Sequence, residues 1–229
     1  MEHISSWSIF VRPLSTLDSL REQPRWLYAA LISGMIAAAV NGYVIQRIGL
    51  VRMIELTTHA KGMIDPQAIL QNAAEHTVQI LCFQAGSMVV SSVVIALAIA
   101  TVLWLLLALC GFEMTLRQGL AVVAHVHLLS VALRECMMVL TVWLTQDPGQ
   151  LDLNNPLATN PAFFLKPVSP VAAKFLVSLD LITFVNIALL IVGFTRVCPK
   201  LSTRAASILV VVPWTFYIGT TLAIKSFMP

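Results

Sequence analysis

The sequence contains few charged residues. Only 11% of its 229 residues are Asp, Glu, Lys or Arg, and 58% are hydrophobic, whereas a soluble domain carries about 25% charged residues. A chain this apolar cannot cover its core with a polar surface, which excludes a soluble globular protein. Disorder is excluded as well, because it requires low hydrophobicity and high charge. The composition predicts a polytopic membrane protein.

The sequence also lacks the motifs of common enzymes. It has no HExxH, no phosphate-binding GxxxxGK[ST], no GxSxG elbow and no GxGxxG. Its histidines do not have zinc-ligand spacing, and His125 and His127 lie about 200° apart around a helix, so they cannot chelate one metal. No block of like charge indicates a nucleic-acid partner. We therefore expect no enzymatic activity, no cofactor and no nucleic acid.

The four cysteines form no CxxC pair. They are far apart and lie inside or at the edge of apolar segments: Cys82, Cys110, Cys136 and Cys198. We interpret them as buried small hydrophobic side chains rather than as a disulfide or metal-binding set.

Five apolar runs are long enough to cross a hydrocarbon core, which takes about 20 helical residues. They cover residues 27–45, 80–110, 119–144, 171–197 and 205–224. Lipid-exposed backbone must satisfy its own hydrogen bonds, and these runs are continuous rather than alternating, so helices are predicted and barrel strands are not. The expected fold is an all-α bundle of five transmembrane helices.

The second run is too long for a simple span. At 1.5 Å per residue it reaches roughly 46 Å, so the helix must tilt or extend beyond the bilayer. Asp65 followed by Pro66 has the form of an N-cap with proline at the first helical position. This favours extension, with a helix that starts near Pro66.

Residues 1–26 read as a cytoplasmic amphipathic segment before the transmembrane domain of residues 27–229. Leu14, Leu17 and Leu20 are interspersed with polar residues, a pattern typical of a short helix on the membrane surface. Arg25 and Trp26 suit the membrane interface.

The distribution of Lys and Arg outside the spans predicts the orientation. A cytoplasmic amino terminus places seven of them inside (Arg12, Arg21, Arg25, Arg117, Arg196, Lys200 and Arg204) and five outside (Arg47, Arg52, Lys61, Lys166 and Lys225). Because cytoplasmic loops carry the excess of Lys and Arg, we expect the amino terminus in the cytoplasm.

The connection between the third and fourth runs is rich in proline and asparagine. Five prolines and three asparagines lie between Asp147 and Pro170, which prevents a long helix and favours turns. From composition alone it is a solvated connection.

Three segments resemble the bacterial Yip1 family. The stretch 111–125 is similar to that family's glycine, polar turn and "tfrqalavvay" helix entry. Asn155, Pro156 and Asn160 belong to a segment that resembles its loop motif, and the stretch 178–194 resembles its "slDlft…iGf" helix. The chain departs from the family at Asn186, where tryptophan is frequent, and at His125, where tyrosine is.

The resemblance implies a five-helix integral membrane domain without enzymatic activity. Eukaryotic members are associated with vesicle trafficking, and some bacterial members are encoded with ABC-type exporters. The chain is therefore expected in the bacterial inner membrane as a scaffold or accessory subunit, with membrane lipid and another membrane subunit, such as an ABC-type exporter, or a second copy of itself as partners.

Four ionisable residues fall inside the predicted spans: Arg134 and Glu135 in the third, Lys174 and Asp180 in the fourth. Charges in a span are costly and mark candidate functional groups. In consecutive antiparallel helices, Arg134 and Asp180 would lie about 15 Å and 14 Å from the same surface. They are therefore expected to pair, and the long stem of Lys174 allows it to reach toward Glu135 or water.

This polar cluster has three interpretations. It is a neutral ion-pair group that fixes helix register, a proton or ion pathway, or, through Asp180, a contact to a partner subunit. The second interpretation gives the alternative function, a small channel or transporter that uses the charged residues of the third and fourth helices. Small residues at spacing four in the first run, Ala30, Gly34 and Ala38, favour close helix packing within the chain over dimerisation.

Overall fold

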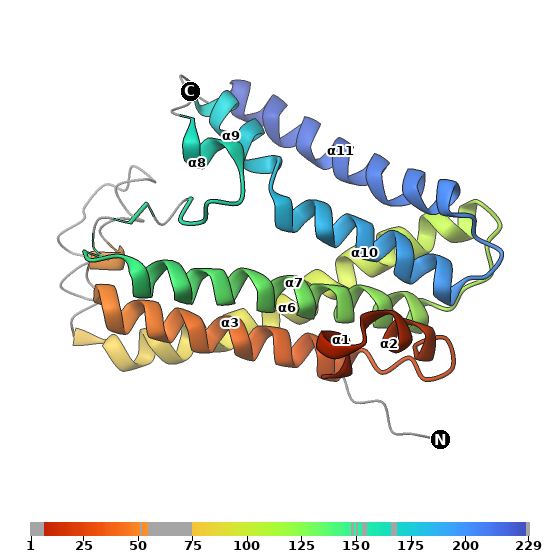
Figure 1. Cartoon of the computed structure of the whole chain (residues 1–229), viewed down its shortest axis with the longest axis horizontal. Coiled ribbons are helices and arrows are strands. Elements are labelled where there is room, and N and C mark those ends of the chain that lie inside the picture. The colour runs from red at the N-terminus through yellow and green to blue at the C-terminus, as the bar shows by residue number, and fades with distance from the viewer. Residues whose placement is uncertain are drawn as a thin grey trace.

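The structure is a computed structural model that describes residues 7–50, 52–54, 75–147, 149, 151–152, 155–165 and 169–227. All regular secondary structure in these ranges is helical, and they contain no strand. The helices are α1 (Ser8–Val11), α2 (Pro13–Ser19), α3 (Leu27–Ile48), α6 (Thr77–Leu109), α7 (Leu116–Leu144), α8 (Pro161–Phe164), α9 (Pro170–Ser178), α10 (Leu181–Val197) and α11 (Thr203–Phe227) (Figure 1).

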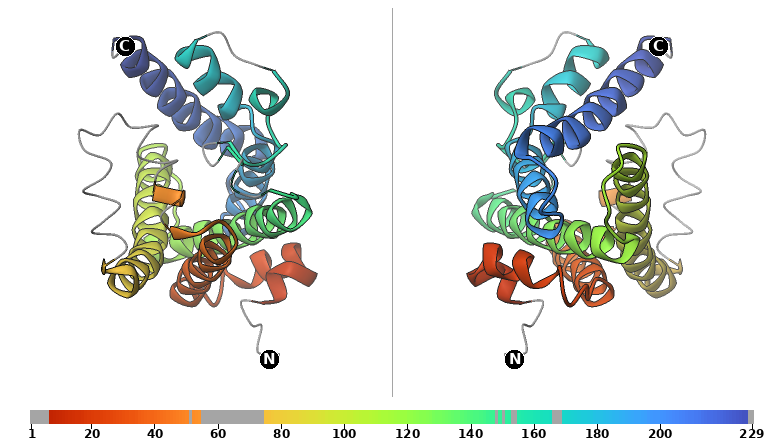
Figure 2. Two further views of the ribbon diagram at one scale, coloured as in Figure 1. Left: turned by 90° about the vertical axis from the view of Figure 1, so that its left-hand side faces the viewer. Right: turned by 90° about the vertical axis from the view of Figure 1, so that its right-hand side faces the viewer.

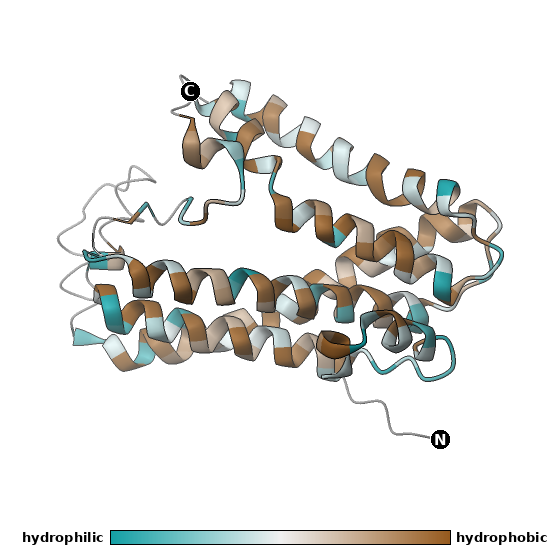
Figure 3. Ribbon diagram, in the orientation of Figure 1, coloured by the Kyte–Doolittle hydropathy of each residue, from teal (hydrophilic) through white to brown (hydrophobic). Residues whose placement is uncertain are grey.

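Four helices, α3, α6, α7 and α11, are each long and apolar enough to cross a membrane. A fifth span results if α9 and α10 are counted together. Hydrophobic residues, coloured brown in Figure 3, recur along each of these helices. The expected all-helical class is confirmed, and the structure has four or five candidate spans where the sequence predicted five.

The fourth apolar run is not the single helix that residues 171–197 predict. It is divided into α9 and α10, which are bent by 45° at a short break. The second run is continuous as α6, whose 33 residues reach about 50 Å. The predicted helix start near Pro66 lies outside the described residues, and α6 begins at Thr77.

Helix α7 forms the centre of the bundle and packs on α3, α6 and α10. All of its residues from 119 to 126 are buried. Much of the core around it consists of small side chains that allow close helix approach: Ala29, Ala30, Ala96, Ala100, Ala121 and Ala124.

Helices α3 and α6 are in close contact at Gly34. A Cβ atom on Gly34 would lie 2.5 Å from the Cα of Val89. Beside it, the buried hydroxyls of Ser33 and Ser92 hydrogen-bond to each other across the two helices. At Ala30, Ser33 and Gly34, the small-residue face of α3 is therefore used for packing within the chain, as the sequence favoured.

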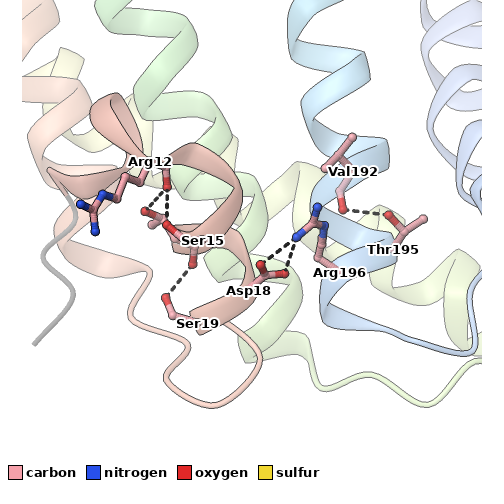
Figure 4. A network of polar contacts seen from close by, with 8 residues as sticks. Arg12, Ser15, Asp18, Ser19, Val192, Thr195 and Arg196 are labelled. Carbon is pink, nitrogen blue, oxygen red and sulfur yellow. Dashed lines mark hydrogen bonds and ion pairs between the residues drawn. The ribbon is translucent and has the colours of Figure 1, made fainter. Parts of the chain in front are cut away.

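The amino-terminal helices pack against the bundle. Leu17 of α2 and the following Leu20 are buried in the main core, and a Cβ atom on Gly193 of α10 would lie 3.4 Å from Leu17 Cδ2 and 2.6 Å from Val122 Cγ1. Arg196 Nη1 donates two hydrogen bonds, of 2.9 and 2.7 Å, to the carboxylate of Asp18 (Figure 4). The apolar side of α2 thus contacts other helices through Leu17, while Leu14 is exposed.

The cysteines differ from the expectation. Only Cys198 is buried, whereas Cys82, Cys110 and Cys136 are exposed, and all four are free thiols. Exposed large hydrophobic residues lie close to them in the sequence: Phe83 beside Cys82, Leu109 beside Cys110 and Leu133 near Cys136. Apolar sequence surroundings do not imply burial within the protein when the exterior of a bundle is itself apolar.

Candidate functional site

The site is built around the break between α9 and α10. Ser178 ends α9, and its hydroxyl donates to the backbone oxygen of Lys174, a local bond that competes with helix continuation. Asp180 has extended backbone dihedrals and occupies the N-cap position of α10, a position that aspartate favours. Ser178 thus favours the end of α9 and Asp180 favours the start of α10, so the break forms without a proline or a glycine.

The connection before α8 is attached to this break. The Leu181 amide donates to the Thr159 carbonyl at 2.9 Å. Asn155 and Asn160 exchange side-chain hydrogen bonds, at 3.3 Å from Asn155 Nδ2 to Asn160 Oδ1 and at 2.8 Å in the reverse direction. These bonds fix the asparagine motif next to Asp180.

Asp180 is a buried carboxylate with one oxygen left without a donor. The residue is only 7% exposed. Its Oδ2 accepts a 3.4 Å hydrogen bond from the Thr183 hydroxyl and lies 3.6 Å from Nη2 of Arg134. Its Oδ1 is buried, and among the described residues no group donates to it. The expected proximity of Arg134 and Asp180 is confirmed.

The comparison of depths assumed that Asp180 lies within a continuous helix, and this assumption is wrong. Asp180 lies at the helix break, where its side chain is held by Thr183 three residues later. The tendency of aspartate to precede a helix was the signal that could have located this break.

A pocket of about 540 Å³ opens beside this carboxylate. It is lined by all four predicted intramembrane charges (Arg134, Glu135, Lys174 and Asp180) and by the three predicted loop residues (Asn155, Pro156 and Asn160). The structure therefore brings into one site two groups of residues that no sequence pattern had connected. With two cations and two carboxylates, the formal charges of its walls cancel.

The four charges are unevenly paired. In the part of the chain that the structure describes, only Arg134 and Asp180 form an ion pair across the pocket. Lys174 and Glu135 line the same pocket, but their side chains do not form the contact that the sequence allowed. Arg134 is only loosely held, because its side chain is 55% exposed.

Helix α11 supplies a wall that sequence reasoning missed. Trp214 and Tyr217 line the pocket together with the charged residues of α7 and α9, and the Trp214 ring centroid lies 5.9 Å from that of Phe184 on α10. No pattern along the chain links these aromatics to Asp180, since only the packing of α11 on α9 and α10 brings them together.

None of the described histidines (His76, His125 and His127) lines this pocket. His125 is buried in α7 and its Nδ1 bonds the Ala121 carbonyl at 2.9 Å. His127 lines a separate cavity of about 190 Å³ together with Ser130 and Arg134. Within the described residues, no three His, Cys, Asp or Glu side chains are grouped so as to hold a metal ion.

Over the described residues, the fold is all-helical with four or five helices able to cross a membrane, and a charged pocket lies at the break between α9 and α10. Comparisons with protein-family models, with curated proteins and with solved structures find no match. The resemblance to the Yip1 family therefore rests on the sequence motifs alone.

Proposed function

We propose that this protein is a non-enzymatic, five-span protein of the bacterial inner membrane, similar to the Yip1 family, with a cytoplasmic amino terminus. In this proposal α9 and α10 together form one bent span. The hydrogen bonds of Arg196 to Asp18 and of Gln118 to the Arg21 carbonyl support it, because they attach the amino-terminal segment to the ends of α10 and α7. That end carries the basic residues that the orientation argument places inside.

Its proposed role is that of a scaffold or accessory subunit of a larger membrane machine, with an ABC-type exporter as the leading candidate. The observation that carries this proposal is the exposure of α11. Only 6% of its most apolar 18-residue stretch is buried inside the protein, whereas 28–39% of the corresponding stretches of α3, α6 and α7 is buried. The helix leans away from the α3–α6–α7 layer (Figure 2), which leaves most of its surface available for another helix.

One face of α11 is suited to close helix contact. Thr215, Gly219 and Ala223 recur at spacing four and are exposed, and a Cβ atom on Gly219 would meet nothing within 4 Å. Small residues at this spacing let two helix backbones approach in a membrane. A partner helix that packs here would complete the burial of α11.

The proposal is tested by co-purification from native membranes with Gly219→Leu and with Gly86→Leu as the matched control. Gly86 is also an exposed helical glycine with nothing within 4 Å of its Cβ position, but it lies on α6. We expect the wild type and Gly86→Leu to retain a stoichiometric membrane partner that Gly219→Leu loses. Retention of the partner by all three proteins would contradict the use of this face.

A small channel or transporter is the alternative, and the charged pocket is the observation that favours it. All four intramembrane charges line that pocket, and such groups mark ion and substrate pathways. Reconstitution in vesicles tests it: selective flux that is lost in Asp180→Asn would replace the scaffold proposal by a transport function.

A further inference from the structure

An apolar groove adjoins the charged pocket at the helix break. It has a volume of about 490 Å³, and Thr159 and Asn160 line both the groove and the pocket. The rest of its wall is mainly apolar and includes Phe164, Leu165 and Phe184, all of them exposed. A polar pocket and an apolar groove therefore share one wall.

The backbone of Asp180 separates the two environments. Its extended conformation directs successive side chains to opposite sides. Leu179 and Leu181 line the groove, whereas Asp180 between them lines the pocket. The break thus divides a charged side from an apolar side within three residues, and a ligand that occupies both must be amphiphilic.

The groups in the pocket specify the polar part of that ligand. The buried Oδ1 of Asp180 has no donor among the described residues, and a buried carboxylate oxygen is unfavourable unless a hydrogen bond or a cation compensates it. Arg134 and Lys174 present cationic donors to the same space, and such groups bind phosphate. Because the pocket's formal charges cancel, a ligand with one cation and one anion matches it better than a net anion does.

We propose that this pocket and groove bind a zwitterionic phospholipid with a primary ammonium headgroup, of the phosphatidylethanolamine class. The ammonium donates to the carboxylate of Asp180, the phosphate lies against Arg134 and Lys174, and an acyl chain occupies the groove beside Phe164 and Phe184. A primary ammonium has N–H donors, whereas the trimethylammonium of phosphatidylcholine has none. The pocket volume is within the range of small-ligand sites, about 300–1,000 Å³.

The test is native mass spectrometry of the full-length protein in detergent, titrated with phosphatidylethanolamine and phosphatidylcholine of identical acyl chains. We expect about tenfold tighter binding of phosphatidylethanolamine, the effect of one charge-assisted hydrogen bond. Asp180→Asn should remove this preference. Asp18→Asn is the matched control, since it removes a carboxylate that pairs with Arg196 outside the pocket, and it should keep the preference.

Several outcomes would overturn the proposal. These are equal binding of the two lipids, an equal loss of preference in both variants, and tighter binding of anionic phosphatidylglycerol. Deacylated glycerophosphoethanolamine that binds as tightly as the intact lipid would assign the pocket to a soluble zwitterion instead. The comparison of lipids on the wild-type protein decides the question even if Asp180→Asn does not fold, and it does not depend on the α11 interface.

Discussion

At the scale of single residues, Asp180 combines burial with incomplete pairing. Arg134, its ionic partner among the described residues, has a side chain that is more than half exposed, and the 3.6 Å separation is longer than a hydrogen bond. An ion pair with one exposed member contributes little by itself. The importance of Arg134 for folding is therefore that it compensates a carboxylate that the protein has already removed from water.

This asymmetry predicts a non-additive double replacement. Arg134→Ala leaves a buried carboxylate without compensation and should lower the free energy of unfolding by about 1–3 kcal/mol. Asp180→Ala should cost less, because the exposed Arg134 reaches water. The double variant should be more stable than Arg134→Ala alone. The measurement is the free energy of unfolding by SDS titration in mixed micelles, and a double variant that loses the sum of the two single effects would show that the residues are not coupled.

The residues of the site were largely predictable, but their arrangement was not. Arg134, Glu135, Lys174 and Asp180 are conspicuous because charge is rare in apolar runs, and this can be read along the chain. The aromatic wall from Trp214 and Tyr217 depends on how α11 packs. The hydrogen bonds between Asp18 and Arg196 join residues 178 positions apart, and no local pattern encodes such a distance.

At the scale of helices, the structure separates two kinds of glycine. Gly34 on α3 faces the backbone of α6, so that a Cβ atom would collide with Val89. Gly42, two turns later on the same helix, has nothing within 4 Å of its Cβ position. The first glycine permits helix contact, and the second contributes only backbone freedom.

Alanine substitutions at these two glycines should have opposite effects. Gly34→Ala forces α3 and α6 apart, and overpacking of this kind costs about 1–3 kcal/mol. Gly42→Ala should stabilise the protein by up to about 1 kcal/mol, because alanine loses less backbone entropy in a helix. Thermal unfolding in detergent should show a lower midpoint for the first variant and an unchanged or higher midpoint for the second. Equal midpoints for the two variants would contradict the close contact of α3 and α6 at Gly34.

At the scale of the whole molecule, the number of spans depends on the bent pair α9–α10. If the pair crosses the membrane once, the connection before α8 and the turn at residues 198–202 lie on opposite sides. If the pair is re-entrant, they lie on the same side. The proposed five-span topology requires the first arrangement.

Cysteine labelling distinguishes these two topologies. Ala158→Cys and Lys200→Cys are introduced separately into a chain whose four native cysteines are replaced, since three of these are exposed. Ala158 and Lys200 are both exposed. In spheroplasts, a membrane-impermeant maleimide should label position 158 directly and position 200 only after permeabilisation. Labelling of both positions from the same side would make the α9–α10 pair re-entrant.

The sequence by itself determined the helical class and the approximate positions of the apolar helices. Hydrocarbon thickness and the need to satisfy backbone hydrogen bonds act along the chain, so that an apolar run of sufficient length is enough to recognise a candidate span. Only the tertiary structure decided three features of the site. These are the helix break at Asp180, the Asp180 oxygen that has no hydrogen-bond donor among the described residues, and the pocket that the asparagine loop, the four charged residues and the aromatic residues line together. They depend on which helices pack together, and in an apolar sequence the same composition is compatible with many packings, because lipid and protein surfaces are alike in polarity.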